Sequence, residues 1–278
     1  MAAIAAPRLV DLLNLAAVSQ ASGFRVLRGT GGLALNETSA DPSRVLSLDW
    51  PELERVLPDR GLPRGVIEIA SPNASHASHA SHASNKNGAG AVMRGGATTI
   101  ALSAIRAVHA NANGGHSRSR WCAWITESTA APLYAPAVAQ AGVDLDRLLV
   151  VRPEPVDLAR AVVKVASSGA FDLVVIDAPN GLDGKLALVS SNANGARAPH
   201  TRPPPRVDAA VIIRKLALAA EERGTTFIVL TNLYTPRAVP WPVALRLEVE
   251  RRPEAIAVRV TKDRRGRASS QHVVRVAL

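Results

Sequence analysis

Short apolar runs alternate with longer amphipathic stretches between residues 66 and 231. The runs consist mainly of Val, Ile, Leu and Ala and predict buried strands, while apolar residues that recur every three or four positions predict helices. The predicted strands are 66–70, 121–125, 148–151, 171–177 and 225–231, and the predicted helices are 98–112, 131–141, 156–167 and 207–223. This alternation predicts right-handed βαβ units and a mostly parallel central sheet flanked by helices, which is an α/β fold.

The two ends of the chain depart from this alternation. Three apolar runs with no helix between them follow at 244–249, 255–261 and 272–276, and they predict an antiparallel carboxy-terminal extension of the sheet. Residues 1–44 form a weakly patterned lead-in with a short amphipathic helix expected at its start, and 71–94 include three Ala-Ser-His repeats. We therefore predict one core domain over 45–278, with a low-complexity insertion at 71–94.

The net charge favours an anionic partner but does not identify it. The 278 residues include 33 Lys and Arg against 23 Asp and Glu, which gives a formal charge of +10. Nucleic acid is the commonest partner of such a chain. However, only five of the basic residues are lysines, as expected from an arginine-rich coding bias, so the charge alone only slightly favours nucleic acid.

Three features exclude other classes of protein. Cys122 is the single cysteine, so an internal disulfide scaffold is impossible. No apolar run reaches the length of about 18 residues that a membrane-spanning helix requires. Arg8 and Asp11 interrupt the apolar amino terminus, which is therefore not a typical signal peptide, and we expect a cytoplasmic protein without a membrane partner.

Five segments resemble the bacterial RecA recombinase family in their order and spacing. They are 46–69, 96–102, 122–149, 168–177 and 244–264, so that the match extends over about 45–267. The resemblance implies a RecA-like P-loop NTPase core. The family's separate carboxy-terminal domain and its amino-terminal polymerisation segment are not recognisable, and this shorter outline is similar to the ImuA-type accessory proteins of damage-induced mutagenesis.

The phosphate loop of that family ends in Gly-Lys-[Ser/Thr], where the lysine reaches the phosphates and the hydroxyl holds Mg²⁺. Here Gly95 and Gly96 lead to Ala97 in place of the lysine, followed by Thr98 and Thr99. The resemblance implies that these residues line an ATP site, with Mg²⁺ on Thr98. Two interpretations stay open, namely a surviving anion site with Arg94 as its cation, or a loop that leads into an ordinary helix. The missing lysine argues against hydrolysis in both.

Three further residues match positions of the family's nucleotide site. The resemblance implies that Asp177, at the end of a strand, holds Mg²⁺, that Glu127 polarises the attacking water, and that Tyr134 stacks on adenine. The alternatives are a carboxylate that caps the next turn for Asp177 and a core aromatic at a helix start for Tyr134. Glu127 is useful as a general base only if phosphate is held in front of it.

Three more residues match positions that contact the nucleotide in the RecA family. Asn232 stands where the family has a γ-phosphate-sensing Gln. Lys262 and Arg264 match two cations that reach the nucleotide of a neighbouring subunit, which implies a homo-oligomer; the alternative is a solvated basic turn.

The family's two DNA loops correspond to 178–206 and 233–242. Cations there and in the basic turn near 265, with one aromatic residue suited to stacking on bases, are the expected DNA contacts. They are Lys185, Arg197, Arg202, Arg206, Arg237, Trp241, Arg265 and Arg267. Aromatic residues in the second loop are equally suited to fixing the loop or contacting a protein.

Together these features predict an ATPase-impaired DNA-damage-response protein of the SOS type. We expect an accessory of translesion synthesis that acts through single-stranded DNA, RecA or a translesion polymerase complex, with ATP and Mg²⁺ as its only candidate cofactors. One alternative is an active, divergent DNA-dependent ATPase or recombinase. The other is a regulator that binds only proteins, such as a cell-division inhibitor.

Overall fold

The computed structural model describes residues 45–72, 95–111, 120–178, 182, 208–234, 242–267 and 269–276. The amphipathic helix expected near the amino terminus and the Ala-Ser-His repeats lie outside the described residues. None of the helices in the described ranges is long and apolar enough to cross a membrane.

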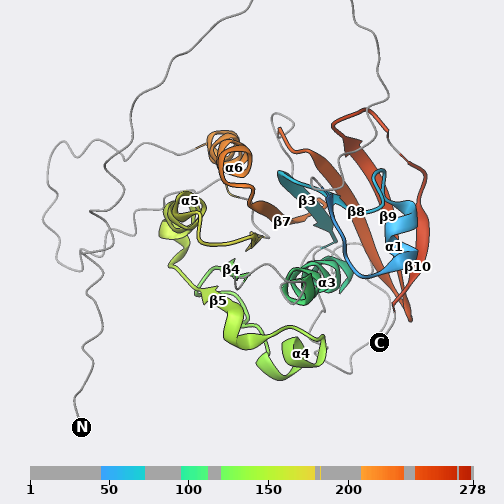
Figure 1. Cartoon of the computed structure of the whole chain (residues 1–278), viewed down its shortest axis with the longest axis horizontal. Coiled ribbons are helices and arrows are strands. Elements are labelled where there is room, and N and C mark those ends of the chain that lie inside the picture. Colours follow the sequence, from blue (N-terminus) through green and yellow to red (C-terminus); the bar gives the residue numbers. More distant parts are fainter. Residues whose placement is uncertain are drawn as a thin grey trace, which may run out of the picture. The chain divides into compact units, whose positions relative to one another are not determined.

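A single eight-stranded sheet, with the order β10-β9-β8-β3-β7-β6-β4-β5, forms the centre of the core (Figure 1). Its strands are β3 (Val66–Ser71), β4 (Cys122–Thr126), β5 (Leu148–Val151), β6 (Leu173–Asp177), β7 (Thr226–Asn232), β8 (Leu245–Arg252), β9 (Ala255–Asp263) and β10 (His272–Arg275). All neighbours from β5 to β8 are parallel, and β9 and β10 add antiparallel pairs. The predicted α/β fold with a mostly parallel sheet and an antiparallel extension is confirmed.

Strand β8 differs from the expectation, because it pairs in parallel with β3 and only its other edge is antiparallel, to β9. The apolar run alone could not show this, since the direction of a strand depends on where the preceding connection returns the chain. The segment between Asn232 and Leu245 carries the chain from the carboxyl edge of the parallel strands back to their amino edge.

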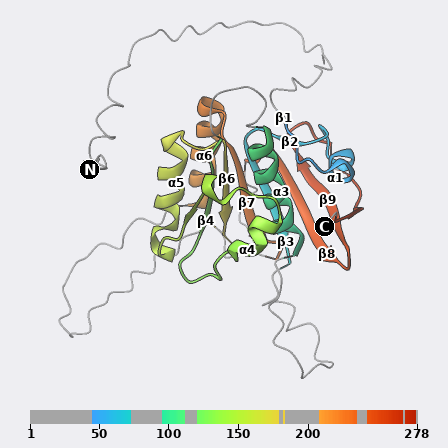
Figure 2. The same cartoon turned by 60° about the horizontal axis from the view of Figure 1, so that its bottom comes forward.

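Helices cover both faces of the sheet (Figures 1 and 2). The longer ones are α3 (Gly95–Asn111), α5 (Leu158–Ser168) and α6 (Ala209–Arg223), and the shorter ones are α1 (Pro51–Val56), α4 (Ala135–Gln140) and the 3₁₀ turns η3 (Leu145–Arg147) and η4 (Pro155–Asp157). A small antiparallel pair, β1 (Val45–Leu46) with β2 (Leu62–Pro63), flanks α1. Gly169 and Gly224 end α5 and α6 with φ of 62° and 71°, a left-handed conformation that glycine adopts without strain.

Two apolar layers sandwich the sheet, because successive side chains of each strand point to opposite faces. Ile67, Ile69 and Trp124 pack beneath α3, whereas Val66 and Phe227 pack beneath α5 and α6. The four central strands β3, β7, β6 and β4 are buried over nearly their whole length. This burial on both faces explains why their sequences are continuous apolar runs rather than alternating ones.

Candidate functional site

The carboxyl ends of β3, β7, β6 and β4 meet at one edge of the sheet, which we call the carboxyl edge. Ser71 pairs with Asn232, and Asp177 lies between Leu230 of β7 and Thr126 of β4. Glu127 directly follows Thr126. The fold therefore gathers Glu127, Asp177 and Asn232, three of the predicted site residues, at the edge where open parallel sheets bind ligands.

Asp177 is a buried carboxylate held at this edge. Its residue is 8% exposed, and the hydroxyl of Thr126 donates to Asp177 Oδ2 at 3.5 Å. Neighbouring backbone is fixed by the bond from Ala178 N–H to Leu230 O at 3.1 Å. An oriented carboxylate in this place suits the outer coordination of a hydrated Mg²⁺, whose assignment to Asp177 stays a prediction.

Glu127 lies in a loop that is tied to the end of β5. Arg152 donates from Nη2 to the carbonyl oxygens of Ser128 and Ala130 at 2.7 and 2.6 Å. Ser128 N–H donates to Pro153 O at 2.8 Å. The carboxylate of Glu127 is half-buried and accepts a 3.5 Å hydrogen bond from Thr129. Glu127 thus directly follows the strand partner of Asp177, and its side chain is only partly buried.

The start of α3 packs tightly on β8 and β9. A methyl group placed on Gly96 would lie 2.4 Å from Val249 Cγ1 and 2.6 Å from Ile256 Cγ2, so only glycine fits this approach. Ala97, at 2% exposure, belongs to the core beneath α3. The position that corresponds to the lysine of the resembling family is therefore a buried methyl group. Thr98 and Thr99 are partly exposed in the same turn.

Arg251 is a cation near this helix start that the sequence analysis missed. It pairs in register with Ile256, one of the residues against Gly96. Because side chains alternate along a strand, Leu247, Val249 and Arg251 share the face that α3 covers. Arg251 is exposed. The alternation of side chains within 245–252 shows on which face of the sheet Arg251 lies. That this face meets the start of α3 follows only from the packing of Gly96 on β8 and β9.

Asn232 and Tyr134 occupy different environments at the carboxyl edge. Asn232 is 5% exposed, and its Oδ1 accepts from Tyr234 N–H at 3.1 Å, so the side chain stabilises its own turn. Tyr134 is 71% exposed before the first turn of α4. It is therefore not the core aromatic of the alternative interpretation, while stacking on adenine stays a prediction.

Lys262 and Arg264 lie at the opposite edge of the sheet, which we call the amino edge. Asp263, between them, pairs with Leu245, which in turn pairs with Ile67 near the start of β3. Within one chain the fold does not bring these two cations together with Asp177 and Glu127. This placement is compatible with the contact to a neighbouring subunit, which stays a prediction.

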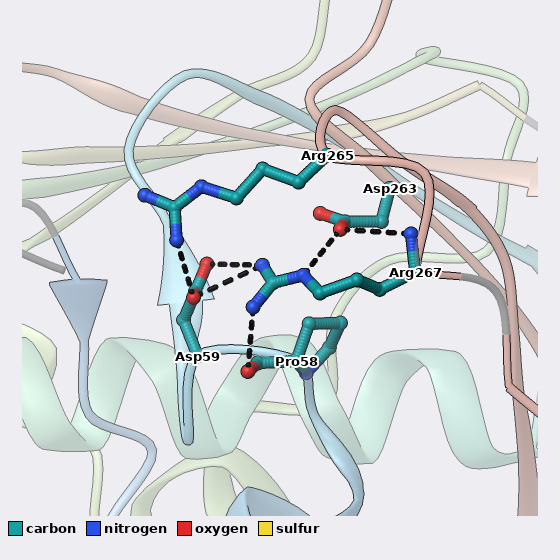
Figure 3. Close-up of polar contacts among 5 residues, drawn as sticks. All are labelled: Pro58, Asp59, Asp263, Arg265 and Arg267. Atoms are coloured by element: carbon teal, nitrogen blue, oxygen red, sulfur yellow. Dashed lines mark hydrogen bonds and ion pairs between the residues drawn. The ribbon is translucent and has the colours of Figure 1, made fainter. Parts of the chain in front are cut away.

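Arg267 is bound by other residues of the chain (Figure 3). Its Nε donates to Asp263 at 2.8 Å, its Nη1 to Pro58 O at 3.1 Å, and its Nη2 to both oxygens of Asp59 at 3.0 Å. The hydrogen bond to Asp263 and the pairing with Asp59 raise the pKa of Arg267. Arg265 Nη1 also donates to Asp59, at 3.1 Å. The basic turn near 265 is thus attached to the segment after α1.

The other predicted DNA contacts lie outside the described residues. They are Lys185, Arg197, Arg202, Arg206, Arg237 and Trp241. Within the part of the chain that the structure describes, no group of three His, Cys, Asp or Glu side chains is arranged to hold a metal ion.

A buried polar network in the central strands also escaped the sequence analysis. Glu68 of β3, at 1% exposure, accepts a 2.8 Å hydrogen bond from Thr231, the residue before Asn232. Arg246 Nη1 of β8 lies 3.9 Å from Glu68, and its Nη2 lies 3.8 Å from Glu248. A single glutamate in an apolar run gave no sign of these partners, which come from two strands distant in sequence.

Comparisons with known proteins identify the fold. No protein-family model matches the sequence, and no curated protein matches it. Among solved structures, the RadB recombinase superposes with a TM-score of 0.51 at 12% sequence identity, covering 84% of this chain and 96% of that chain. The fold is RecA-like. At this identity the similarity establishes the architecture alone.

Proposed function

We propose that the protein is a RecA-like DNA-damage-response factor with an impaired ATPase, acting as an accessory of translesion synthesis. The observation that carries the proposal is the start of α3, where Ala97 is 2% exposed and packs in the apolar core. This helix opens beside the carboxyl edge that holds Asp177 and Glu127. The proposal therefore combines a retained RecA-like frame with the loss of its phosphate-binding ammonium group.

The loss of that ammonium has a large expected effect on turnover. Phosphoryl transfer depends on preorganised cations that stabilise charge on the transferred group, and removing one such partner costs about 3–4 kcal/mol of transition-state stabilisation, or a factor of about 10²–10³ in rate. Asp177, Glu127 and Thr98 are suited to holding Mg²⁺ and water but supply no positive charge. We therefore expect any nucleotide to be bound with negligible hydrolysis.

The proposed partners follow from charge and architecture. A net charge of +10 supports binding to a polyanion. The structural neighbour is a recombinase, a class of protein that works on DNA, and we extend this property to the present chain as part of the proposal. RecA and a translesion polymerase complex are the proposed protein partners, and self-association is the proposed oligomeric behaviour.

Affinity for single-stranded DNA, measured with and without ATP and Mg²⁺, tests the proposal. We expect binding that weakens steeply with salt and is the same with and without the nucleotide. Asp177→Asn should leave this affinity unchanged. An affinity that requires ATP and is lost in Asp177→Asn would contradict nucleotide-independent DNA binding, and no binding at low salt would favour a regulator that binds only proteins.

Arg251 favours one second candidate, an active divergent ATPase. Its pairing with Ile256, which packs on Gly96, would allow it to replace the missing lysine at the start of α3. In that case the protein would hydrolyse ATP, and Arg251→Gln would abolish turnover. Arg252→Gln is the matched control, because Arg252 is the next exposed arginine of β8 but, by strand alternation, points to the opposite face.

A further inference from the structure

Two segments distant in sequence lie side by side at the amino edge. They are 58–65, between α1 and β3, and 262–267, at the end of β9. Together they contain six basic residues and two acidic ones. The amino edge is opposite the carboxyl edge, so these charges lie away from the candidate nucleotide site of the same chain.

Hydrogen bonds fix the two segments to each other. Arg267 joins the turn to Pro58 and Asp59 at 3.0–3.1 Å (Figure 3). At the other end, Arg264 N–H donates to Ala244 O at 2.8 Å, and a methyl group on Gly65 would lie 3.5 Å from Ala244 Cβ. Arg64, next to Gly65, and Arg264 therefore flank the same residue.

Burial divides the charges of these segments into two groups. Both carboxylates are inward, since the side chains of Asp59 and Asp263 are 12% and 4% exposed and both bind Arg267. Outward there are only cations, which we call the amino-edge ridge: Arg60, Arg64, Arg264 and Arg265. No large apolar side chain of 58–65 or 262–267, all of which the structure describes, is exposed.

The ridge retains most of its hydrogen-bond donors. Arg265 uses Nη1 for Asp59 and is 51% exposed, and Arg64 uses Nη1 for Gly224 O at 3.3 Å. A guanidinium carries five N–H donors in a planar fork that matches the oxygens of a phosphate. An acidic protein would need an exposed apolar side chain on the ridge to bind it as strongly as nucleic acid does, and the ridge offers no such side chain.

We propose that the amino-edge ridge binds the phosphate backbone of single-stranded nucleic acid through Arg60, Arg64, Arg264 and Arg265. Arg267 holds the ridge together and does not itself bind the ligand. This inference rests on the proposed function, to which it adds the binding surface and a role for Arg60 and Arg64. It places nucleic acid at the edge of the sheet away from the candidate nucleotide site.

The test is a salt titration of binding to a fluorescent single-stranded oligonucleotide, measured by anisotropy. Each phosphate contact to a single strand contributes about 0.7 to the slope of log affinity against log salt. The double variant Arg64→Gln/Arg264→Gln should make this negative slope shallower by about 1.4 and weaken binding by more than about tenfold at about 50 mM salt. Arg160→Gln on α5, whose side chain is 78% exposed, is the control and should change the slope little.

The outcomes separate this inference from the proposed function. Wild-type binding with an unchanged slope in the double variant would overturn the ridge while leaving the proposed function intact. An equal loss in Arg160→Gln would also overturn it, since any surface charge would then suffice. Loss of ATP-dependent self-association in Arg264→Gln, with unaltered DNA binding, would assign Arg264 to a neighbour's nucleotide instead. Absence of wild-type binding would contradict the DNA role itself.

Discussion

Arg267 shows how far the role of a charged residue depends on partners distant in sequence. In the sequence it is one arginine of a basic turn, suited to phosphate. In the structure Asp59, 208 residues earlier, accepts two hydrogen bonds from its guanidinium. Sequence reasoning could identify the cations of the turn but not divide them into structural and exposed ones, because that division depends on which carboxylates the fold brings beside them.

Replacing Asp59 should therefore destabilise the protein. Asp59→Ala removes both partners of Arg267 Nη2 and the partner of Arg265, and we expect the free energy of unfolding to fall by about 1–3 kcal/mol. Denaturant titration measures this change. In the control Asp157→Ala, which removes an exposed pair with Arg160, the loss should not exceed about 1 kcal/mol. Equal effects of the two substitutions would show that Asp59 has no special structural role.

His109 gives the protein a specific sensitivity to acid. It is 3% exposed at the end of α3, its Nδ1 accepts from Asp144 N–H at 3.3 Å, and burial together with nearby Arg147 lowers its pKa, against a smaller opposing effect of Asp144. Because the pKa is lower in the folded state, the unfolded chain binds more protons below about pH 6.5. Stability that is present above this pH should be lost as the pH falls.

The variant His109→Asn tests this pH dependence. Its amide oxygen can accept the Asp144 N–H but does not titrate. Denaturant titrations at about pH 7.5 and pH 5.5 should show a smaller loss of unfolding free energy in the variant than in the wild type. Identical losses would show that His109 does not contribute to acid sensitivity.

At the scale of elements, the apolar pattern predicted the strands of the parallel sheet and the helices between them. The observed ends of some elements differ from the predicted ones. For example, α4 was predicted to begin at residue 131 but begins at Ala135, with a proline in its first turn. Strand β5 was expected among the buried strands, yet Leu149 and Val150 are each more than 40% exposed because β5 forms the edge of the sheet. The order of strands in the sheet cannot be read from periodicity.

Because α3 approaches β8 and β9 closely, we predict that a Gly→Ala substitution in this helix lowers the stability of the protein instead of raising it. Gly→Ala inside a helix ordinarily stabilises it by about 1 kcal/mol. At Gly96 the added methyl would lie 2.4 Å from Val249, so Gly96→Ala should destabilise the protein by about 1–3 kcal/mol. Thermal or denaturant unfolding measures the change. A stabilised variant would show that the start of α3 does not pack as described.

At the scale of the whole molecule, the sheet separates two kinds of chemistry. Asp177, Glu127 and the start of α3 lie at the carboxyl edge together with Arg251, and the exposed arginines of the ridge lie at the amino edge. The resemblance to RecA predicted the two carboxylates and the helix start from the sequence, because strand ends in a known order must meet at one edge. It could not predict Glu68 with Arg246, Arg251 near the start of α3, or Arg64 near Arg264, since each depends on register and packing between distant segments.

The measurement that tests the account most directly is steady-state ATP hydrolysis by the wild-type protein in the presence of saturating single-stranded DNA. We predict a rate indistinguishable from that of Asp177→Asn, because the buried methyl of Ala97 leaves the transferred phosphoryl group without its cation. DNA-stimulated hydrolysis that disappears in Asp177→Asn would contradict the central claim.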